Sequence, residues 1–409
     1  MGSCLFINNS QVSLCPVIKY TEKTLSLGNQ PISNRFVSNK DDDVPCFPLE
    51  FSWNDTLGCM MLDTHFPVDE VRPRFDWITC FEPEDHLDEL VNNIIKVCDL
   101  TAGSRISGYS FKDDSTLARL DGKGCKNTWR IDPKVDLGAD QPLANIETLQ
   151  EAFNSSNVKL MIRRRDRSDV VIARHVVEHA YRLGEWLSCL GEMLTDDGYV
   201  VLEIPDCERA MVSGDCTILW EEHTAYFNAK SFRALLRHCG FSVVYEKVYF
   251  YPLENSIVFI ARKSVYVAGV PKVDFEPERE IFRNFCESIS RRALKTRARL
   301  EGLRESRGQN GIFGAGHLSI AFLSYNEVSH LVSACFDDNP HKVGMFLPVG
   351  GVPIIGSDCL NFEQYPICLL GLNPQHHGKI RNVLSDYVKQ GGQLISIFPE
   401  TAQNIDEIL

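Results

Sequence analysis

The sequence lacks three features that would assign it to a membrane, to the secretory route or to a thiolate metal module. It contains no apolar run of 18 residues, no basic start followed by an apolar stretch, and no C-x-x-C pair. The first two absences argue against a membrane-spanning helix and a secretory signal, so we expect a cytoplasmic protein. Positive charge is also scarce: 42 Lys and Arg stand against 55 Asp and Glu, a formal net charge of -13. Because an acidic surface repels nucleic acid and anionic membranes, we expect neither as a partner and favour a small molecule.

What remains is the composition of an ordinary globular protein. Hydrophobic residues make up 44% and charged residues 24% of the 409 residues. At roughly 150 residues per domain, this length predicts two or three domains with well-formed cores. Fifteen cysteines are scattered from Cys4 to Cys368. We interpret them as reduced thiols that pack like small hydrophobic side chains.

Helix-like and strand-like patterns alternate from about His86 onward. Apolar residues recur at helical spacing in 86–99, whereas 169–173 (DVVIA) and 199–204 (YVVLEI) are continuous apolar runs typical of buried strands. We expect Pro205 to stop the second strand. The alternation predicts a mostly parallel sheet with helices on both faces. Further helices are expected at 183–194 and 231–238, and further strands at 129–131, 242–251 and 256–261.

A second α/β unit begins near Gly311. It is preceded by the charged segment 271–307, whose spaced apolar residues predict a long connecting helix. Its arginines are interpreted as a solvated face rather than as a binding patch. Strands are expected at 312–313, 330–336, 367–372 and 393–397, whereas residues 1–80 show only short β-like runs.

Four polar stretches follow predicted strands: 108–115, 131–132, 175–179 and 314–317. Ligands bind beyond the carboxyl ends of strands in open parallel sheets, so these are the candidate binding loops. Asp132 follows Gly108 by 24 residues, a spacing suited to an acid that holds ribose hydroxyls, although an aspartate before proline is also a common turn residue. The first loop lacks a second glycine, and Ser110 is small enough to replace it in part.

The stretch 175–179 (HVVEH) has three interpretations. Its H-x-x-E-H pattern is that of an inverted zinc-peptidase motif, in which one helix presents two histidines to a metal. The strand directly before it argues against one helical face for His175 and His179, and no third ligand is evident. Surface polar residues are the second interpretation, and a polar active-site loop is the one we favour.

The stretch 220–227 (WEEHTAYF) places an acid beside a histidine between aromatic residues. Imidazole titrates near working pH and aromatic rings exclude water, so His223 is a candidate general base. Glu222 could orient the ring, although adjacent side chains point apart in most backbones.

Together these stretches resemble the sugar C-methyltransferases that act on nucleotide-linked deoxysugars. The resemblance runs from about Leu25 to Pro399, and its strength lies in the order and spacing of several motifs. The matching segments are 24–36 (TLSLGNQPISNRF), 173–179 (ARHVVEH), 198–205 (GYVVLEIP), 222–227 (EHTAYF), 314–316 (GAG), 338–342 (DNPHK) and 351–354 (GVPI).

This resemblance implies an α/β fold of three domains. Residues 1–82 would form a small β-rich domain of degenerate zinc-binding type. Residues 83–265 would form a Rossmann-like class I methyltransferase domain that binds S-adenosylmethionine. Residues 266–409 would form the linking helix and a C-terminal Rossmann-like domain that binds the substrate's nucleotide.

The resemblance also implies roles for single residues in methyl transfer to a carbon next to a ketone. His223 would be the base, Glu222 its neighbour in the motif, and His179 a donor or second acid–base group. Asp132 would hold the cofactor ribose. Gly108, Ser110, Asp113 and His175 complete the expected cofactor site, and Trp77, Trp220, Tyr226, Gly314 and Gly316 the expected substrate site.

The sequence departs from the family at several of its polar positions. Asn54 and Leu57 stand where the N-terminal module has cysteines, so we expect no structural zinc, although Cys4, Cys15, Cys46 and Cys59 could form an irregular site. Phe75, Trp77 and Trp220 replace aromatic residues that carry hydroxyl groups in the family.

The leading hypothesis is therefore an S-adenosylmethionine-dependent methyltransferase acting on a nucleotide-linked sugar or a related small molecule through an enolate. One alternative is a non-methylating protein that binds a nucleotide or nucleotide-sugar. Another keeps an adenosyl cofactor but uses it for a different reaction, such as transfer to nitrogen or oxygen.

Overall fold

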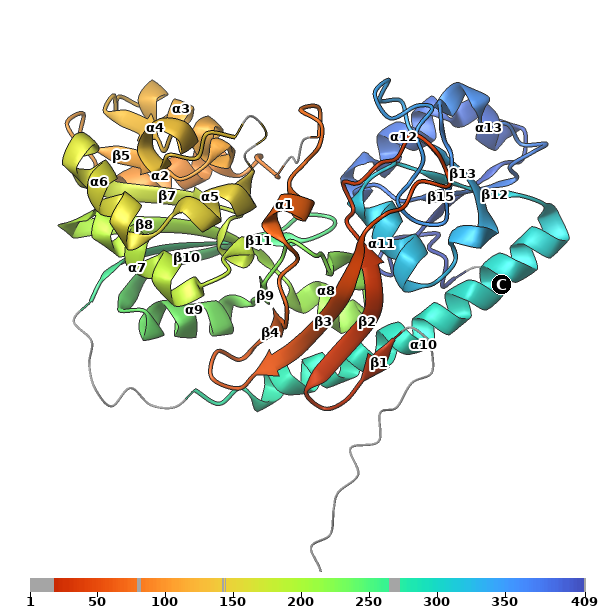
Figure 1. The fold of residues 1–409 in the computed structure, drawn as a ribbon, viewed down its shortest axis with the longest axis horizontal. Helices are drawn as coiled ribbons and strands as arrows, with labels where there is room; N and C mark the ends of the chain where they lie inside the picture. Colours follow the sequence, from red (N-terminus) through yellow and green to blue (C-terminus); the bar gives the residue numbers. More distant parts are fainter. Residues whose placement is uncertain (1–17, 79–81, 142, 144, 265–272, 408–409) are drawn as a thin grey trace, which may run out of the picture.

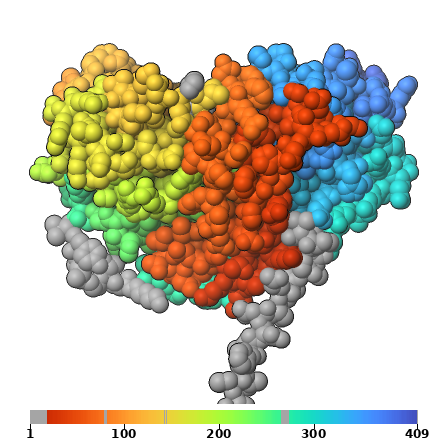
Figure 2. Space-filling view, viewed as in Figure 1, coloured from red at the N-terminus to blue at the C-terminus, as the bar shows by residue number. Residues whose placement is uncertain are grey.

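Three β-sheets organise the chain in a computed structural model that describes residues 18–78, 82–141, 143, 145–264 and 273–407. The N-terminal sheet lies between two α/β units, and in the space-filling view residues of the N-terminal part separate the other two on the visible face (Figures 1 and 2). The predicted α/β fold class is confirmed. The domain boundaries at 82/83 and 265/266 stay a prediction.

The middle sheet has the strand order β10-β11-β8-β7-β5-β6, and its strands β8, β7, β5 and β6 are parallel. Successive residues of β7 face opposite sides: Val170 and Ile172 pack in one core cluster, and Val171 and Ala173 in another. Helices therefore cover both faces, as predicted. The strands are β5 (Ile106–Gly108), β6 (Thr128–Arg130), β7 (Ser168–Arg174), β8 (Leu194–Asp206), β10 (Phe241–Tyr249) and β11 (Asn255–Lys263).

Helices α2 and α3 contribute to the first of these core clusters, and α6, α7 and α9 to the second. The helices of this unit are α2 (Leu87–Val97), α3 (Asp114–Gly122), α4 (Pro133–Leu137), α5 (Ile146–Ala152), α6 (Ser155–Arg165), α7 (Leu183–Met193), α8 (Glu208–Ser213) and α9 (Ala229–His238).

The expectation that Pro205 ends its strand is wrong. Strand β8 continues to Asp206 and pairs with β11 through Pro205 and Ser256. On its other side, the last pair that β8 makes with β7 joins Glu203 to Arg174. The missing N–H of Pro205 therefore breaks no hydrogen bond to β7, and a proline is tolerated there.

The C-terminal unit has a wholly parallel sheet with the order β14-β13-β12-β15-β16. The predicted connecting helix is α10 (Glu276–Arg307), which passes beneath the N-terminal sheet on its way to this unit (Figure 1). The other elements are β12 (Asn310–Phe313), β13 (Val332–Phe336), β14 (Ile354–Ile355), β15 (Ile367–Leu370), β16 (Gln393–Ser396), α11 (His317–Tyr325), α12 (His377–Val383) and α13 (Ser385–Lys389).

The N-terminal sheet takes its last strand from the middle of the chain. Strand β4 pairs with β9, joining Met60 to Tyr226 and Met61 to Ala225. The segment that carries Glu222 and His223 is therefore anchored on the N-terminal sheet as well as on the middle unit. The remaining elements are β1 (Lys19–Tyr20), β2 (Thr24–Pro31), β3 (Cys46–Asn54), β4 (Cys59–Leu62), β9 (Ala225–Tyr226) and α1 (Val68–Val71).

The twelve described cysteines are all free thiols. Cys4 and Cys15, which we named with Cys46 and Cys59 as a conceivable irregular metal site, lie outside the described residues. Within the described part of the chain, no helix combines the length and the apolar character that crossing a membrane requires.

Candidate active site

A cavity of about 460 Å³ lies where the three parts of the chain meet. Its wall combines aromatic rings with a few charged and amide groups, which is the usual make-up of a small-molecule site. It is lined by Ser33, Asn34, Phe36, Pro73, Phe75, Asp76, Trp77, Ile78, Phe111, Lys112, Leu143, Asn145, Ile146, Glu147, His179, Trp220, Glu222, Ala315, Gly316, His317, Asn339 and Lys342.

The loop after β7 begins with a strained residue. His175 has a φ of 49°, in the left-handed region that side chains rarely adopt. Its N–H donates to the carbonyl of Glu203 at 2.8 Å, and its Nε2 lies 3.1 Å from Glu203 Oε1. These contacts hold the bend that leads into the short 3-10 helix η2 (Val177–His179). His175 thus lies before η2 and contacts Glu203, so the two histidines of the H-x-x-E-H pattern do not share one helical face.

A network of buried charged side chains holds this loop in place. The guanidinium Nε of Arg174 donates to Glu203 Oε2 at 2.6 Å, and both side chains are fully buried. Burial opposes ionisation of Glu203, yet Arg174 and His175 hold the pKa of this carboxyl well below its ordinary value. Burial likewise opposes protonation of His175, but Glu82 and Glu203 raise its pKa to about 10.

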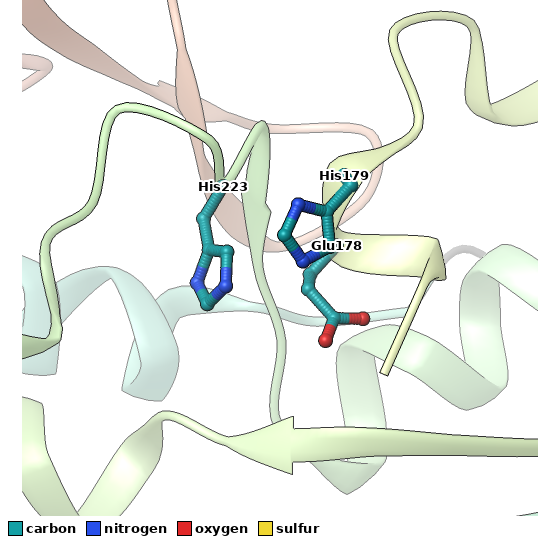
Figure 3. A group of neighbouring side chains, drawn as sticks. All are labelled: Glu178, His179 and His223. Carbon is teal, nitrogen blue, oxygen red and sulfur yellow. The ribbon is translucent and has the colours of Figure 1, made fainter. Parts of the chain in front are cut away.

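His179 lies on the cavity wall between two acidic side chains and a second imidazole. Its Nδ1 is 2.7 Å from Glu147 Oε1, and its ring centroid is 4.8 Å from that of His223 at an interplanar angle of 86°. Figure 3 shows the rings of His179 and His223 side by side with the Glu178 carboxylate close to both. His223 is not among the lining residues and sits behind the wall.

Burial sets the charge of the two predicted catalytic neighbours. It lowers the pKa of His223 well below the ordinary imidazole value, and the neighbouring His179 and Lys112 side chains lower it further. Burial also raises the pKa of the Glu222 carboxyl well above its ordinary value, reinforced by the negative charges of Glu147 and Glu221. Both shifts favour the neutral form: a neutral His223 can accept a proton, and a protonated Glu222 can donate a hydrogen bond.

Tyr226, an expected substrate residue, does not line the cavity. Its hydroxyl accepts from Trp220 N–H at 2.9 Å and donates to the Trp220 carbonyl at 3.2 Å. Tyr226 therefore fixes the loop that carries Trp220. The Trp220 ring lines the cavity and stacks on His317 with centroids 4.5 Å apart.

In the predicted first turn of the cofactor site, a side chain of the turn accepts hydrogen bonds from the backbone N–H groups of the turn. Asp113 accepts hydrogen bonds from the N–H groups of Tyr109 at 2.8 Å, Ser110 at 2.9 Å and Arg174 at 3.0 Å. A Cβ on Gly108 would lie 2.9 Å from Asp113 Cβ, so glycine is required there for close approach. Gly108, Ser110 and Asp113 do not line the cavity, but Phe111 and Lys112 of the same turn do.

Asp132 also has a structural partner. Its Oδ1 accepts from Lys134 N–H at 2.9 Å and from Val135 N–H at 2.8 Å, which caps α4. The residue is exposed and is not part of the cavity wall. The turn interpretation of this aspartate accounts for these contacts, and its role at a ribose stays a prediction.

Of the remaining expected substrate residues, Gly316 and Trp77 line the cavity and Gly314 does not. Gly316 lines the cavity, whereas Gly314 (φ 100°) donates its N–H to Phe336 and serves the turn after β12. Trp77 lines the cavity and is stacked between Phe75 at 4.9 Å and His341 at 5.6 Å between ring centroids.

Sequence reasoning missed Glu147, His317 and Lys342, all of which line the cavity. Glu147 lies in the first turn of α5, where an acid is common for the helix dipole, so no local signal marks it. His317 belonged to a candidate loop, and only the structure shows its ring between Ser33 and Thr217.

His317 also gives a prediction for stability. Its Nδ1 lies 2.9 Å from Ser33 Oγ and its Nε2 3.1 Å from the Thr217 carbonyl oxygen. Burial lowers its pKa from 6.5 to about 4, against the opposing effect of the Thr217 carbonyl. As the pH falls below about 6.5, the unfolded chain protonates this ring while the folded state keeps it neutral. The contribution of His317 to the free energy of unfolding is therefore present above about pH 6.5 and is lost as the pH falls toward 4.

The expected loss is at most about 1.4 kcal/mol of unfolding free energy per pH unit in that window. Urea unfolding of the parent chain and of His317→Gln at several pH values measures it. The variant should show a shallower fall on the acid side, and an identical fall in both proteins would contradict the assignment.

Comparison by sequence identifies two family models along this chain. A model described as a methyltransferase domain matches residues 65–246, and one described as a C-methyltransferase C-terminal domain matches residues 275–399. A search of curated proteins by sequence finds no match.

Comparison with solved structures finds methyltransferases of low identity. One is the 1,6-didemethyltoxoflavin-N1-methyltransferase of Burkholderia thailandensis with bound S-adenosylhomocysteine, 12% identical, covering 44% of this chain and 80% of that chain with a TM-score of 0.30. Another is a S-adenosylmethionine-dependent methyltransferase of Clostridium acetobutylicum, 10% identical, covering 45% of this chain and 93% of that chain with a TM-score of 0.28.

Proposed function

Since the chain belongs to the S-adenosylmethionine-dependent C-methyltransferases, we propose that it methylates a carbon next to a ketone in the cavity between its three parts. The acceptor we propose is a nucleotide-linked sugar or a related small molecule. A base takes the α-proton and the C–H electron pair forms the enolate. The α-carbon then takes the methyl group while the sulfur–carbon bond breaks, leaving S-adenosylhomocysteine.

The observation that carries this proposal is the composition of the cavity wall. Residues from the middle unit supply the acid–base side chains His179 and Glu222, and the C-terminal unit supplies Gly316 and Lys342. A volume of about 460 Å³ falls within the range of about 300–1,000 Å³ that is usual for ligand pockets. The reacting groups of the middle unit and the part of the acceptor bound by the C-terminal unit would therefore share one enclosed space.

The residues present fit an adenosyl cofactor at one end of this wall. Phe111 is 47% exposed and its ring can stack on a base. Lys112 Nζ beside it is held by Glu82 Oε1 at 2.6 Å, and the Asn145 oxygen caps α5, so the Asn145 amide nitrogen is the group that can donate to the cofactor. S-Adenosylmethionine would supply the electrophilic methyl group, and these side chains would orient it.

His223, Glu222 and His179 take the chemical roles in this proposal. In this proposal His179, on the cavity wall, is the second acid–base group and passes the α-proton to the imidazole of His223 behind it. The carboxyl group of Glu222 lines the cavity, and in its protonated form it would donate a hydrogen bond to the enolate oxygen. The free thiols among the described residues fit the cytoplasmic location we propose.

Calorimetric titration of the full chain with S-adenosylmethionine and S-adenosylhomocysteine tests this function. We expect one cofactor site per chain. We also expect the methyl group of labelled S-adenosylmethionine to be transferred to a nucleotide-linked ketosugar, which mass spectrometry detects. Binding of neither cofactor at millimolar concentration would falsify the proposal. Binding of the nucleotide-sugar alone would favour a non-methylating protein instead.

Asp132→Asn tests the predicted ribose contact without disturbing the fold. Asparagine caps helices as well as aspartate does, so α4 should keep its cap. If the carboxylate holds the ribose, loss of its charge should weaken S-adenosylmethionine binding about 10- to 100-fold, since hydrogen bonds to charged groups contribute about 1.5–3 kcal/mol. Calorimetry reads the affinity, and the same affinity in both proteins would leave Asp132 only its capping role.

A further inference from the structure

Buried polar atoms behind the cavity wall have no hydrogen-bond partner among the described residues. They include Glu178 Oε2 and both ring nitrogens of His179, and these two residues are 1% and 3% exposed. The other oxygen of Glu178 faces His175 Nδ1 at 3.7 Å. Leaving such atoms unpaired costs about 1–3 kcal/mol each, so their presence indicates a group that satisfies them.

The side chains that carry these atoms lie close to a third ligand-type side chain, His223. One ligand atom each from Glu178, His179 and His223 lies within 4.8 Å of the other two. Figure 3 shows the two imidazoles side by side, with the carboxylate of Glu178 below the His179 ring. Around a tetrahedral ion with bonds of about 2.1 Å, ligand atoms are about 3.4 Å apart, so only small side-chain movements would close the group.

The contact between Glu147 and His179 decides which atoms of His179 are available. At 2.7 Å, Glu147 Oε1 and His179 Nδ1 are closer than two atoms bonded to one ion normally lie. We infer that Glu147 stands behind Nδ1 and that Nε2 is the nitrogen of His179 that faces an ion. A carboxylate behind the second nitrogen is the usual support of a metal-bound histidine.

We propose that Glu178, His179 and His223 form a binding site for a divalent transition metal ion, which enters through the cavity and inhibits the enzyme. Two imidazoles and one carboxylate suit Zn²⁺, Co²⁺ or Fe²⁺ and disfavour Mg²⁺, which prefers oxygen ligands. The ion would occupy the lone pair with which His223 accepts a proton. This inhibition rests on the proposed function, whereas the binding does not.

The site uses two of the three residues that define the H-x-x-E-H pattern. Glu178 and His179 come from the loop after β7, and His223 comes from the loop before β9, 44 positions along the chain from His179. His175, the first histidine of the pattern, is held by Glu203 and is not a ligand.

Titration of the full chain with Co²⁺ tests the binding. We expect one ion per chain, with visible d–d absorption bands and no sulfur-to-cobalt charge transfer, since the ligands are nitrogen and oxygen atoms. Glu178→Gln, His179→Ala and His223→Ala should each weaken binding at least about 10-fold, and Glu147→Gln by about 10- to 100-fold through the supporting carboxylate. Mg²⁺ should not displace the cobalt.

Controls separate this site from its neighbours and from misfolding. His376→Ala removes an exposed imidazole and should bind cobalt like the parent chain. Thermal unfolding identifies variants that fail to fold, and Glu178→Gln keeps the shape of the side chain. The proposal is overturned if Glu222→Gln abolishes binding while Glu178→Gln does not, or if the bands report sulfur ligands.

Activity measurements distinguish the two proposals. Zn²⁺ should inhibit methyl transfer by the parent chain, a chelator should restore it, and Glu178→Gln should need at least about 10-fold more zinc for the same inhibition. Metal binding by a chain that never transfers methyl groups would overturn the proposed function alone. Methyl transfer by a chain that binds no cobalt or zinc would overturn the metal site alone.

Discussion

His223→Ala is expected to lower kcat for methyl transfer about 10²- to 10⁴-fold, the usual contribution of a positioned general base. The imidazole lies behind His179, with ring centroids 4.8 Å apart, in a segment fixed by the pairing of β9 with β4. Removing it leaves the cavity wall intact, because His223 is not among the lining residues. The affinity for S-adenosylmethionine should therefore stay the same while kcat falls.

Two measurements make this result specific to proton removal. Exchange of the α-proton of a nucleotide-linked ketosugar in D2O, followed by mass spectrometry, reports enolate formation without methyl transfer and should slow with kcat. Added imidazole should restore part of the rate. His238→Ala removes an exposed imidazole on α9 and should leave kcat unchanged. An unchanged exchange rate in His223→Ala, with a loss in His179→Ala, would move the base to His179.

The fold could be predicted because its signals are local. The apolar runs of β7 and β8 are buried on both faces, and no other placement hides continuous valine and isoleucine runs from water. Helix α10 could be predicted from its apolar spacing for the same reason. Pro205 shows the limit: whether a missing N–H matters depends on where the neighbouring strand ends, which is a tertiary property.

The candidate site could be predicted only in part, because polar side chains have alternative partners. Ser110, Asp113 and Asp132 stand at the strand ends where a cofactor site is expected, but the nearest N–H groups already engage their side-chain oxygens. One of the donors to Asp113 is the N–H of Arg174, 61 positions away. Glu147 meets His179 only because α5 packs beside η2, and nothing in the sequence near Glu147 indicates that contact.

Arg174→Met is expected to lower the free energy of unfolding by roughly 3–5 kcal/mol, the cost of leaving a buried charge without its partner. Arg174 is fully buried, pairs with Glu203 at 2.6 Å, and donates to the carbonyls of Lys112 at 2.8 Å and Pro83 at 3.2 Å. Methionine fills a similar volume but leaves the Glu203 carboxylate with only His175 and His86 beside it. Urea unfolding measures the loss.

The double variant Arg174→Met, Glu203→Leu distinguishes the stability that the ion pair contributes from the cost of leaving one buried charge without its partner. Replacing both buried charges by apolar groups should cost less than the sum of the single changes, because neither charge is then left alone. Lys389→Met breaks a pair with Asp386 in which the two side chains are 74% and 83% exposed, and it should leave stability nearly unchanged because solvent screens such a pair. If Arg174→Met cost no more than Lys389→Met, the Arg174–Glu203 pair would not be what holds the turn 108–113 against the loop of His179. Another contact would then have to fix the position of the proposed acid–base groups.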